Sequence, residues 1–152
     1  MSRVAIFTVE HTLAGGDDLR SAFPLPWGKT LYDGLRSQCR TVALTRSTDE
    51  IARWWLNREG FANWSSVLCW NMSMSYEDWR VDVIRDFLAN GWEIDFFIDP
   101  DPDVAVVVRS MGVLTLYLGA PLQRPGFKAE DSPLRSWDEV VSTVDPTSLR
   151  EV

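Results

Sequence analysis

The sequence predicts an α/β fold in which a mostly parallel, five-stranded sheet lies between two layers of helices. Short apolar runs alternate with longer amphipathic segments along the chain, and this alternation is typical of repeated βαβ units. The first run, Val4–Phe7, is apolar without a break, as strands buried on both faces of a parallel sheet usually are. Polar clusters directly follow three of the predicted strands, at residues 8–10, 45–47 and 99–103. Because ligands gather at the carboxyl ends of parallel strands, these clusters indicate where a site would lie.

Five segments have the length and composition of strands, and turn-forming residues separate them from their neighbours. They are residues 4–7, 41–45, 66–70, 93–98 and 114–118. Connections between parallel strands of one sheet are right-handed, so the intervening helices should cover both faces.

The segments between these strands carry apolar residues at helical spacing. We expect helices over residues 29–38, 49–59, 76–90 and 102–111, with a further short helix at 137–144. Thr48 and Ser75 are candidate N-caps, since a side-chain oxygen there can accept a hydrogen bond from the first turn. Ser75 together with Asp78 resembles a capping box.

The chain of 152 residues is long enough to bury the core of one domain. We expect residues 1–125 to form this core domain and residues 126–152 to be a C-terminal extension whose short helix packs on it. The connection over residues 14–28 is too short to hold a large cap domain. We therefore expect any site at the sheet edge to be open to water.

The net charge and the cysteine content limit the classes of partner and the compartment that we expect. The formal net charge is −7, which repels phosphate backbones at long range and makes nucleic acid an unlikely main partner, although a local basic pocket could hold one phosphate. Cys39 and Cys69 lack CxxC spacing and a companion histidine pair, so we expect a reduced, cytoplasmic protein without zinc. The N-terminus lacks the pattern of a signal peptide, and no apolar run approaches a membrane span, so we expect no membrane partner.

Eight tryptophans are unusually many for this length, and six of them lie between residues 54 and 92. We expect these large rings mainly to fill the core. The alternative is an exposed aromatic patch for a protein partner, with Trp27, Trp64 and residues 121–127 as candidates.

The sequence Phe7-Thr8-Val9-Glu10-His11-Thr12-Leu13 resembles the first motif, F-D-x-D-G-T-L, of the haloacid dehalogenase (HAD) superfamily. Thr45 matches the small hydroxyl residue of that family, and Arg80 stands where the family has a lysine or arginine. Residues 98–103, Ile-Asp-Pro-Asp-Pro-Asp, are similar to the fourth, acidic motif. The run from Trp79 to Pro121, together with Arg124-Pro125, also resembles small HAD-like proteins encoded by bacteriophages of actinobacteria.

This resemblance implies a three-layer Rossmannoid fold and a family chemistry in which the first aspartate of the motif attacks phosphorus. The second aspartate is the general acid and base, and magnesium is held by oxygen ligands. The correspondence places residues of this chain at three kinds of position. Thr8 and Glu10 stand at the catalytic positions, and Thr45 and Arg80 stand at the phosphate-binding positions. Asp99 and Asp103 stand at the metal-binding positions. Magnesium is compatible with the resemblance, but we expect no cofactor to be required.

The chain departs from the family pattern at the nucleophile. Thr8 replaces the attacking aspartate, and a neutral hydroxyl gives a metal ion no anionic ligand. Glu10 is one methylene longer than the acid/base aspartate, and His11 replaces a glycine. Since misplacement by about 1 Å can cost a hundredfold in rate, these changes indicate that the phosphatase chemistry is lost.

Several residues keep two interpretations. Thr8 is either a nucleophile activated by Glu10 or His11, or a hydroxyl that lines the pocket and satisfies nearby backbone groups. The acidic stretch at 99–103 is either a residual magnesium site or a strand-to-helix turn. Arg80 either holds phosphate or has a structural role, as a residue on the helix surface or as an ion-pair partner of these aspartates. Thr45 either holds an anion or only ends its strand.

The function that the sequence favours is a catalytically degenerate HAD-like domain that acts as a binding or interaction module for a protein partner. The resemblance to bacteriophage proteins implies a virion component or a modulator of a host protein. The alternative is a magnesium-dependent phosphatase of the HAD type that acts on nucleotides or nucleic-acid ends.

Overall fold

The computed structural model describes residues 3–119, which form five strands and four helices in alternation. In chain order these are β1 (Arg3–Thr8), α1 (Pro26–Leu35), β2 (Arg40–Thr45), α2 (Asp49–Arg58), β3 (Ser66–Cys69), α3 (Tyr76–Ala89), β4 (Glu93–Asp99), α4 (Pro102–Ser110) and β5 (Thr115–Tyr117). The C-terminal extension at 126–152, the helix at 137–144 and the candidate partner segment at 121–127 lie outside the described residues.

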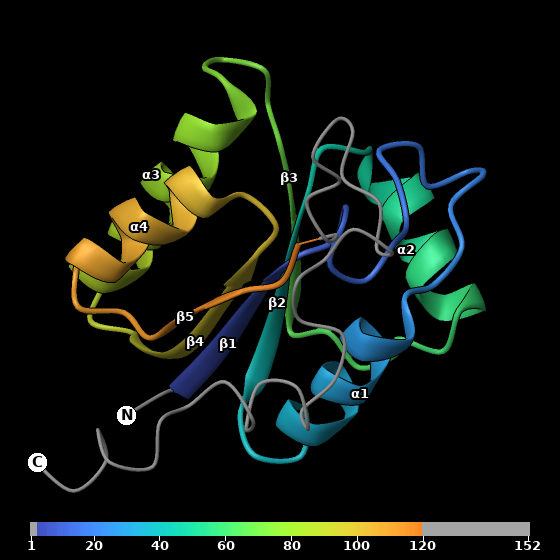
Figure 1. The fold of residues 1–152 in the computed structure, drawn as a ribbon, viewed down its shortest axis with the longest axis horizontal. Helices are drawn as coiled ribbons and strands as arrows, with labels where there is room; N and C mark the ends of the chain where they lie inside the picture. Colours follow the sequence, from blue (N-terminus) through green and yellow to red (C-terminus); the bar gives the residue numbers. More distant parts are fainter. Residues whose placement is uncertain (1–2, 120–152) are drawn as a thin grey trace, which may run out of the picture. The chain divides into compact units, whose positions relative to one another are not determined.

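The five strands make one parallel sheet with the order β3-β2-β1-β4-β5 (Figure 1). The chain builds outward from β1 to β3 on one side and then crosses back to lay β4 and β5 on the other. The strand order therefore reverses between β1 and β4, and their carboxyl ends meet at the point where α/β sheets of this kind usually bind ligands. The α/β fold with a mostly parallel five-stranded sheet, predicted from the sequence, is confirmed.

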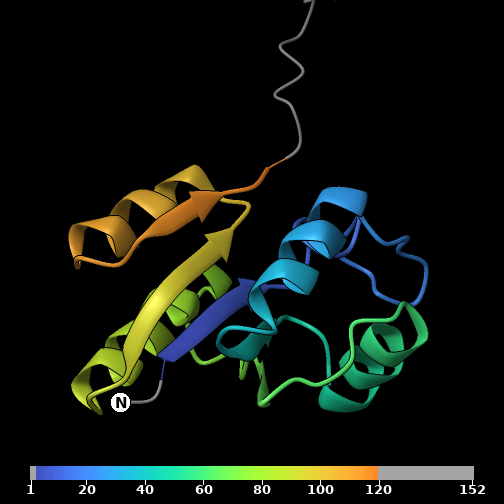
Figure 2. The same ribbon diagram turned by 90° about the horizontal axis from the view of Figure 1, so that it is seen from below.

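Helices α1 and α2 cover one face of the sheet, and α3 and α4 cover the other (Figures 1 and 2). Alternate residues of β1 point to opposite faces, so Ala5 and Phe7 belong to the core under α1 and α2, whereas Val4 and Ile6 belong to the core under α3 and α4. Thr8 continues the second series and points toward α3. No large cap is inserted between these elements.

Two helix starts differ in detail from the sequence expectation. Helix α1 begins at Pro26 rather than at residue 29, because proline suits the first helical turn, where no backbone N–H is needed. Thr48 precedes α2 without a side-chain capping bond. Ser75 does cap α3, where its hydroxyl accepts a hydrogen bond from the Asp78 N–H at 3.1 Å.

The tryptophans divide between core and surface. Trp55 and Trp79 are buried, as expected for core packing. Trp64 is half-buried and stacks on Tyr32 with 4.7 Å between ring centroids, so it is not the exposed partner-binding ring that was one alternative. Trp27 is 44% exposed and remains a surface candidate. In the described part of the chain, no helix is long and apolar enough to cross a membrane.

Candidate functional site: a buried polar cluster at the strand reversal

The carboxyl ends of β1 and β4 bring Thr8 and Asp99 side by side, although 91 positions separate them in the sequence. Phe7 of β1 is in register with Ile98 of β4, so the next residue of each strand occupies the same edge of the sheet. The Thr8 hydroxyl donates a hydrogen bond to Oδ2 of Asp99 at 2.7 Å. At the motif's first position, the threonine thus serves as a donor to the fourth-motif aspartate.

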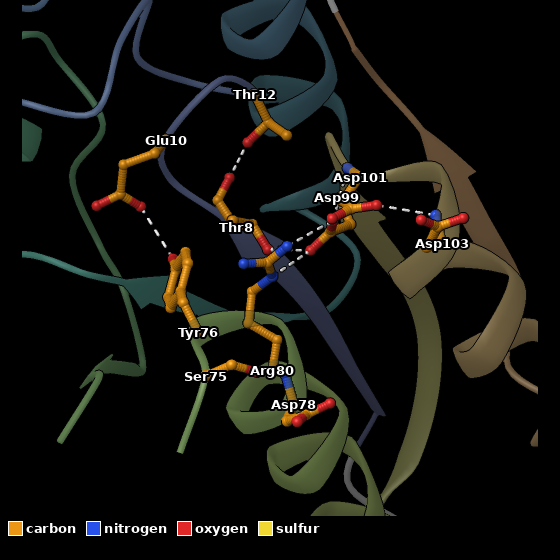
Figure 3. A network of polar contacts seen from close by, with 10 residues as sticks. All are labelled: Thr8, Glu10, Thr12, Ser75, Tyr76, Asp78, Arg80, Asp99, Asp101 and Asp103. Carbon is orange, nitrogen blue, oxygen red and sulfur yellow. Dashed lines mark hydrogen bonds and ion pairs between the residues drawn. The ribbon is translucent and has the colours of Figure 1, made fainter. Parts of the chain in front are cut away.

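Arg80 completes this pair from the second turn of α3 (Figure 3). Its Nε lies 2.8 Å from Oδ2 of Asp99, and its Nη2 lies 3.2 Å from Oδ1. Both side chains are buried, with 3% and 0% of their surface exposed. Of the two sequence interpretations of Arg80, the structure shows the ion pair with an aspartate.

The Asp99 carboxylate has donors on both oxygens. The Asp101 backbone N–H adds a bond to Oδ1 at 2.8 Å, beside those from Thr8 and Arg80. Burial raises the pKa of Asp99, and the Arg80 charge and the Thr8 hydrogen bond oppose that rise. The carboxylate is therefore held by the protein itself, with no lone pair directed toward open solvent.

Glu10 forms the second half of the cluster with residues from β2 and α3. The Thr45 hydroxyl donates to Oε1 at 2.6 Å, and the Arg46 backbone N–H donates to the same oxygen at 3.0 Å. The Tyr76 hydroxyl donates to Oε2 at 3.1 Å. Glu10 is 1% exposed, so its carboxylate is fixed by three donors and shielded from water.

Tyr76 is the residue of this site that sequence reasoning missed. Its ring lies against the Arg80 guanidinium, with 4.3 Å from Cζ to the ring centroid, while its hydroxyl reaches Glu10 (Figure 3). The ring thus joins the two positions that the family correspondence assigns to acid/base catalysis and phosphate binding. One signal was present in the sequence: Tyr76 lies four residues before Arg80 and so shares its face of the helix.

Together these six residues make up what we call the buried polar cluster: Thr8, Glu10, Thr45, Tyr76, Arg80 and Asp99. All of them are buried, and no buried side-chain nitrogen or oxygen among the described residues lacks a hydrogen-bond partner. The expectation that the site would be open to water is therefore wrong. A large cap is not needed to cover it, because Tyr76 at the start of α3 does so.

His11 points away from the buried polar cluster. Its Nε2 lies 2.9 Å from Asp17 on the surface, and Asp17 also pairs with Arg46 at 3.2 Å. The backbone of His11 has φ of 66°, a left-handed conformation that favours the glycine found there in the family motif. Because Thr8 donates to Asp99 and His11 faces Asp17, neither Glu10 nor His11 is placed to activate the Thr8 hydroxyl.

The acidic stretch after β4 builds a helix start. Asp101 is the N-cap of α4, and its carboxylate accepts a hydrogen bond from the Asp103 N–H at 2.8 Å. Pro102 occupies the first turn, where its missing N–H costs nothing. Asp103 lies exposed in that turn, where a negative charge suits the helix dipole.

A magnesium ion does not fit this arrangement of side chains. Thr8 supplies a neutral hydroxyl, and the Asp99 carboxylate is already paired with the Arg80 guanidinium. Asp103 is exposed at the start of α4. Among residues 3–119, no group of three or more His, Cys, Asp or Glu side chains could hold a metal ion. Hard divalent cations need several oxygen ligands at once, which the cluster does not offer.

Comparison with known proteins identifies the fold. No protein-family model and no curated protein match the sequence. A solved structure of the Pnkp1/Rnl/Hen1 RNA repair complex contains a similar chain, with a TM-score of 0.68 and 11% identity over 80% of this chain and 44% of that one. The present chain therefore spans less than half of the length of that relative.

A HAD family enzyme of Bacteroides thetaiotaomicron, solved in complex with magnesium and inorganic phosphate, is similar with a TM-score of 0.51 and 11% identity over 84% of this chain and 100% of that one. A mutant of the same enzyme matches equally well. These likenesses concern the fold. Residues 3–119 thus have a HAD-like, Rossmann-type α/β fold without a large cap.

Proposed function

We propose that this chain is a catalytically degenerate HAD-like domain that acts as a binding or interaction module. The observation that carries the proposal is the contact between the Thr8 hydroxyl and Asp99 at 2.7 Å, closed on the other side by Arg80. A nucleophile must be anionic or have a base within reach, and it must face the substrate. Thr8 is a hydrogen-bond donor to an internal carboxylate and faces no open space.

The burial of the cluster supports the same conclusion. Residues at phosphate-binding positions have to reach the phosphoryl oxygens directly to stabilise their charge. Instead, Thr45 donates its hydrogen bond to Glu10, and Arg80 is paired with Asp99. The Tyr76 ring packs on the Arg80 guanidinium, and its hydroxyl contacts Glu10. In this proposal the residues at the active-site positions hold four elements of the fold together, β1, β2, α3 and β4, and the function depends on the surface of the domain.

We further propose that the partner is a protein. Phe23 and Trp27 are 63% and 44% exposed near the start of α1, and exposed aromatic rings are enriched in protein interfaces. The formal net charge of −7 disfavours nucleic acid. With the resemblance to bacteriophage-encoded proteins, this supports a role as a virion component or as a modulator of a host protein, in the host cytoplasm.

Hydrolysis of p-nitrophenyl phosphate with magnesium tests the degenerate state. We expect no turnover above background for the wild type, and the same for Asp99→Asn. Thr8→Asp restores the carboxylate of the family motif, so activity that appears only in this variant would locate the loss at Thr8. Wild-type turnover at enzyme-like rates that Asp99→Asn abolishes would instead favour the phosphatase alternative.

The partner proposal has its own test. We expect Phe23→Ser with Trp27→Ser to abolish the capture of specific proteins from host lysate that the wild type retains. Trp54→Ser is the matched control, because Trp54 is also exposed but lies on α2. Equal loss in the control would contradict the assignment of the interface to the start of α1.

A further inference from the structure

A cavity of about 540 Å³ lies at the amino-terminal edge of the sheet, opposite to the buried polar cluster. Arg3 and Arg40, the first residues of the paired strands β1 and β2, line it, and so does Arg36 just after α1. Its volume falls within the range of about 300–1,000 Å³ that small-molecule sites usually have. The family correspondence assigns none of these residues a role.

All charged side chains that line the cavity in the described part of the chain are arginines. Arg3 is held by Asp95 at 3.0 Å, and Arg36 lies 3.8 Å from Asp33, so acids outside the lining orient these two arginines and partly balance their charges. Arg40 makes no ion pair with any other of residues 3–119. In a chain with net charge −7, a cavity lined by three arginines and no acid, with Arg40 unpaired among residues 3–119, indicates a local preference for an anion.

The neutral lining residues indicate what kind of anion fits. Gln38, Asn63 and Ser65 offer amide and hydroxyl groups, and the described lining contains no aromatic ring on which a base could stack. Guanidinium groups match the geometry of phosphate oxygens, and amides and hydroxyls suit sugar hydroxyls. The lining thus favours a polar, phosphorylated molecule over a nucleotide.

We propose that this cavity binds a small phosphorylated polar compound, such as a sugar phosphate, through Arg3, Arg36 and Arg40. The phosphate lies between the arginines, and the rest of the ligand lies toward Gln38 and Asn63. This site is independent of the degenerate HAD-like centre. It lies at the other end of the sheet and uses none of the six residues of the buried polar cluster.

Isothermal titration of the full chain with ribose 5-phosphate and with inorganic phosphate, at constant chloride, tests the site. We expect ribose 5-phosphate to bind more tightly than phosphate. Arg40→Gln should weaken binding of both by roughly tenfold, which corresponds to about 1.4 kcal/mol, because a charge-assisted hydrogen bond to the phosphate is lost. Arg109→Gln is the control, because Arg109 is an exposed arginine on α4, and it should change nothing.

Each of the following results would overturn the proposal. The first is the absence of binding heat for either compound at about 10 mM, a concentration that exceeds the dissociation constant of even a weak specific complex. The second is an equal loss of affinity in Arg109→Gln and Arg40→Gln. The third is tighter binding of a 5′-phosphorylated oligonucleotide than of ribose 5-phosphate. Unfolding curves of both variants verify that each remains folded, and a folded Arg40→Gln with unchanged affinity also contradicts the site.

Discussion

The hydroxyl of Thr8 donates a hydrogen bond to the carboxylate of Asp99 across the boundary where the strand order of the sheet reverses. In the HAD motif pattern, carboxylates stand at both positions and share a metal ion. In this chain a hydroxyl donor stands at one of these positions, and the guanidinium of Arg80 supplies the positive charge beside the carboxylate at the other. The polar residues of the site therefore satisfy each other, and each contact can be tested by its effect on stability.

Removal of the Thr8 hydroxyl should destabilise the fold. Thr8→Val keeps the shape of the side chain but leaves Oδ2 of Asp99 with one donor fewer in a buried place. We expect the free energy of unfolding to fall by about 1–3 kcal/mol, measured by urea denaturation. Thr8→Ser keeps the hydroxyl and should cost less, and equal losses in the two variants would show that the hydrogen bond contributes nothing.

Loss of Arg80 should be more severe. Arg80→Met leaves the Asp99 carboxylate buried without its counter-charge, which typically costs about 3–5 kcal/mol. Arg85→Met is the control on the same helix, because Arg85 is exposed. The double variant Arg80→Met/Asp99→Leu should recover much of the loss, and failure to recover would show that Arg80 acts through packing on Tyr76 and not through the ion pair.

The burial of Asp99 should change how the free energy of unfolding depends on pH. Burial raises the pKa of Asp99 above its ordinary value of 3.8, so the native state binds a proton at a higher pH than the unfolded state does. The free energy of unfolding should therefore rise as pH falls through the native pKa, and level off below the unfolded one. Compared with Asp99→Asn, the wild type should gain stability as the pH falls toward about 4. A relative loss of stability on this acidification would mean that the native pKa of Asp99 is lowered.

Tyr76 should matter through its hydroxyl as well as its ring. Tyr76→Phe keeps the ring against Arg80 but leaves Oε2 of Glu10 without its donor. We expect a loss of about 1–3 kcal/mol in thermal or chemical unfolding. The matched control is Tyr117→Phe at the half-exposed end of β5, which should be neutral.

Replacement of His11 by glycine should stabilise the fold, unlike the substitutions above. Its φ of 66° costs a residue with a β-carbon about 1–2 kcal/mol relative to glycine, whereas its bond to Asp17 is exposed and contributes little. His11→Gly should therefore raise the free energy of unfolding by up to about 1 kcal/mol. His11→Ala keeps the strained backbone without the Asp17 contact and should not stabilise; a gain in both variants would rule out backbone strain as the cause.

The sequence was sufficient for the elements and for the edge of the sheet at which the polar residues meet. Apolar runs and N-cap residues are local signals, so β1, β4 and the start of α3 could be predicted. That Thr8 meets Asp99 rather than Glu10 could not, because it depends on β4 lying next to β1, and strand order is not encoded in any short motif. The cover over the site was missed for the same reason: Tyr76 reaches Glu10 only once α3 has packed on the sheet.

We propose that the positions of this chain that resemble the HAD motifs hold neither a metal ion nor a phosphoryl group. Crystals grown in magnesium and beryllofluoride, a mimic of a phosphoryl group, test it most directly. We expect the electron density to show Thr8, Arg80 and Tyr76 in their present contacts, with neither ligand ordered beside Thr8. An ordered magnesium ion and beryllofluoride against the Thr8 hydroxyl, with Tyr76 displaced, would contradict it.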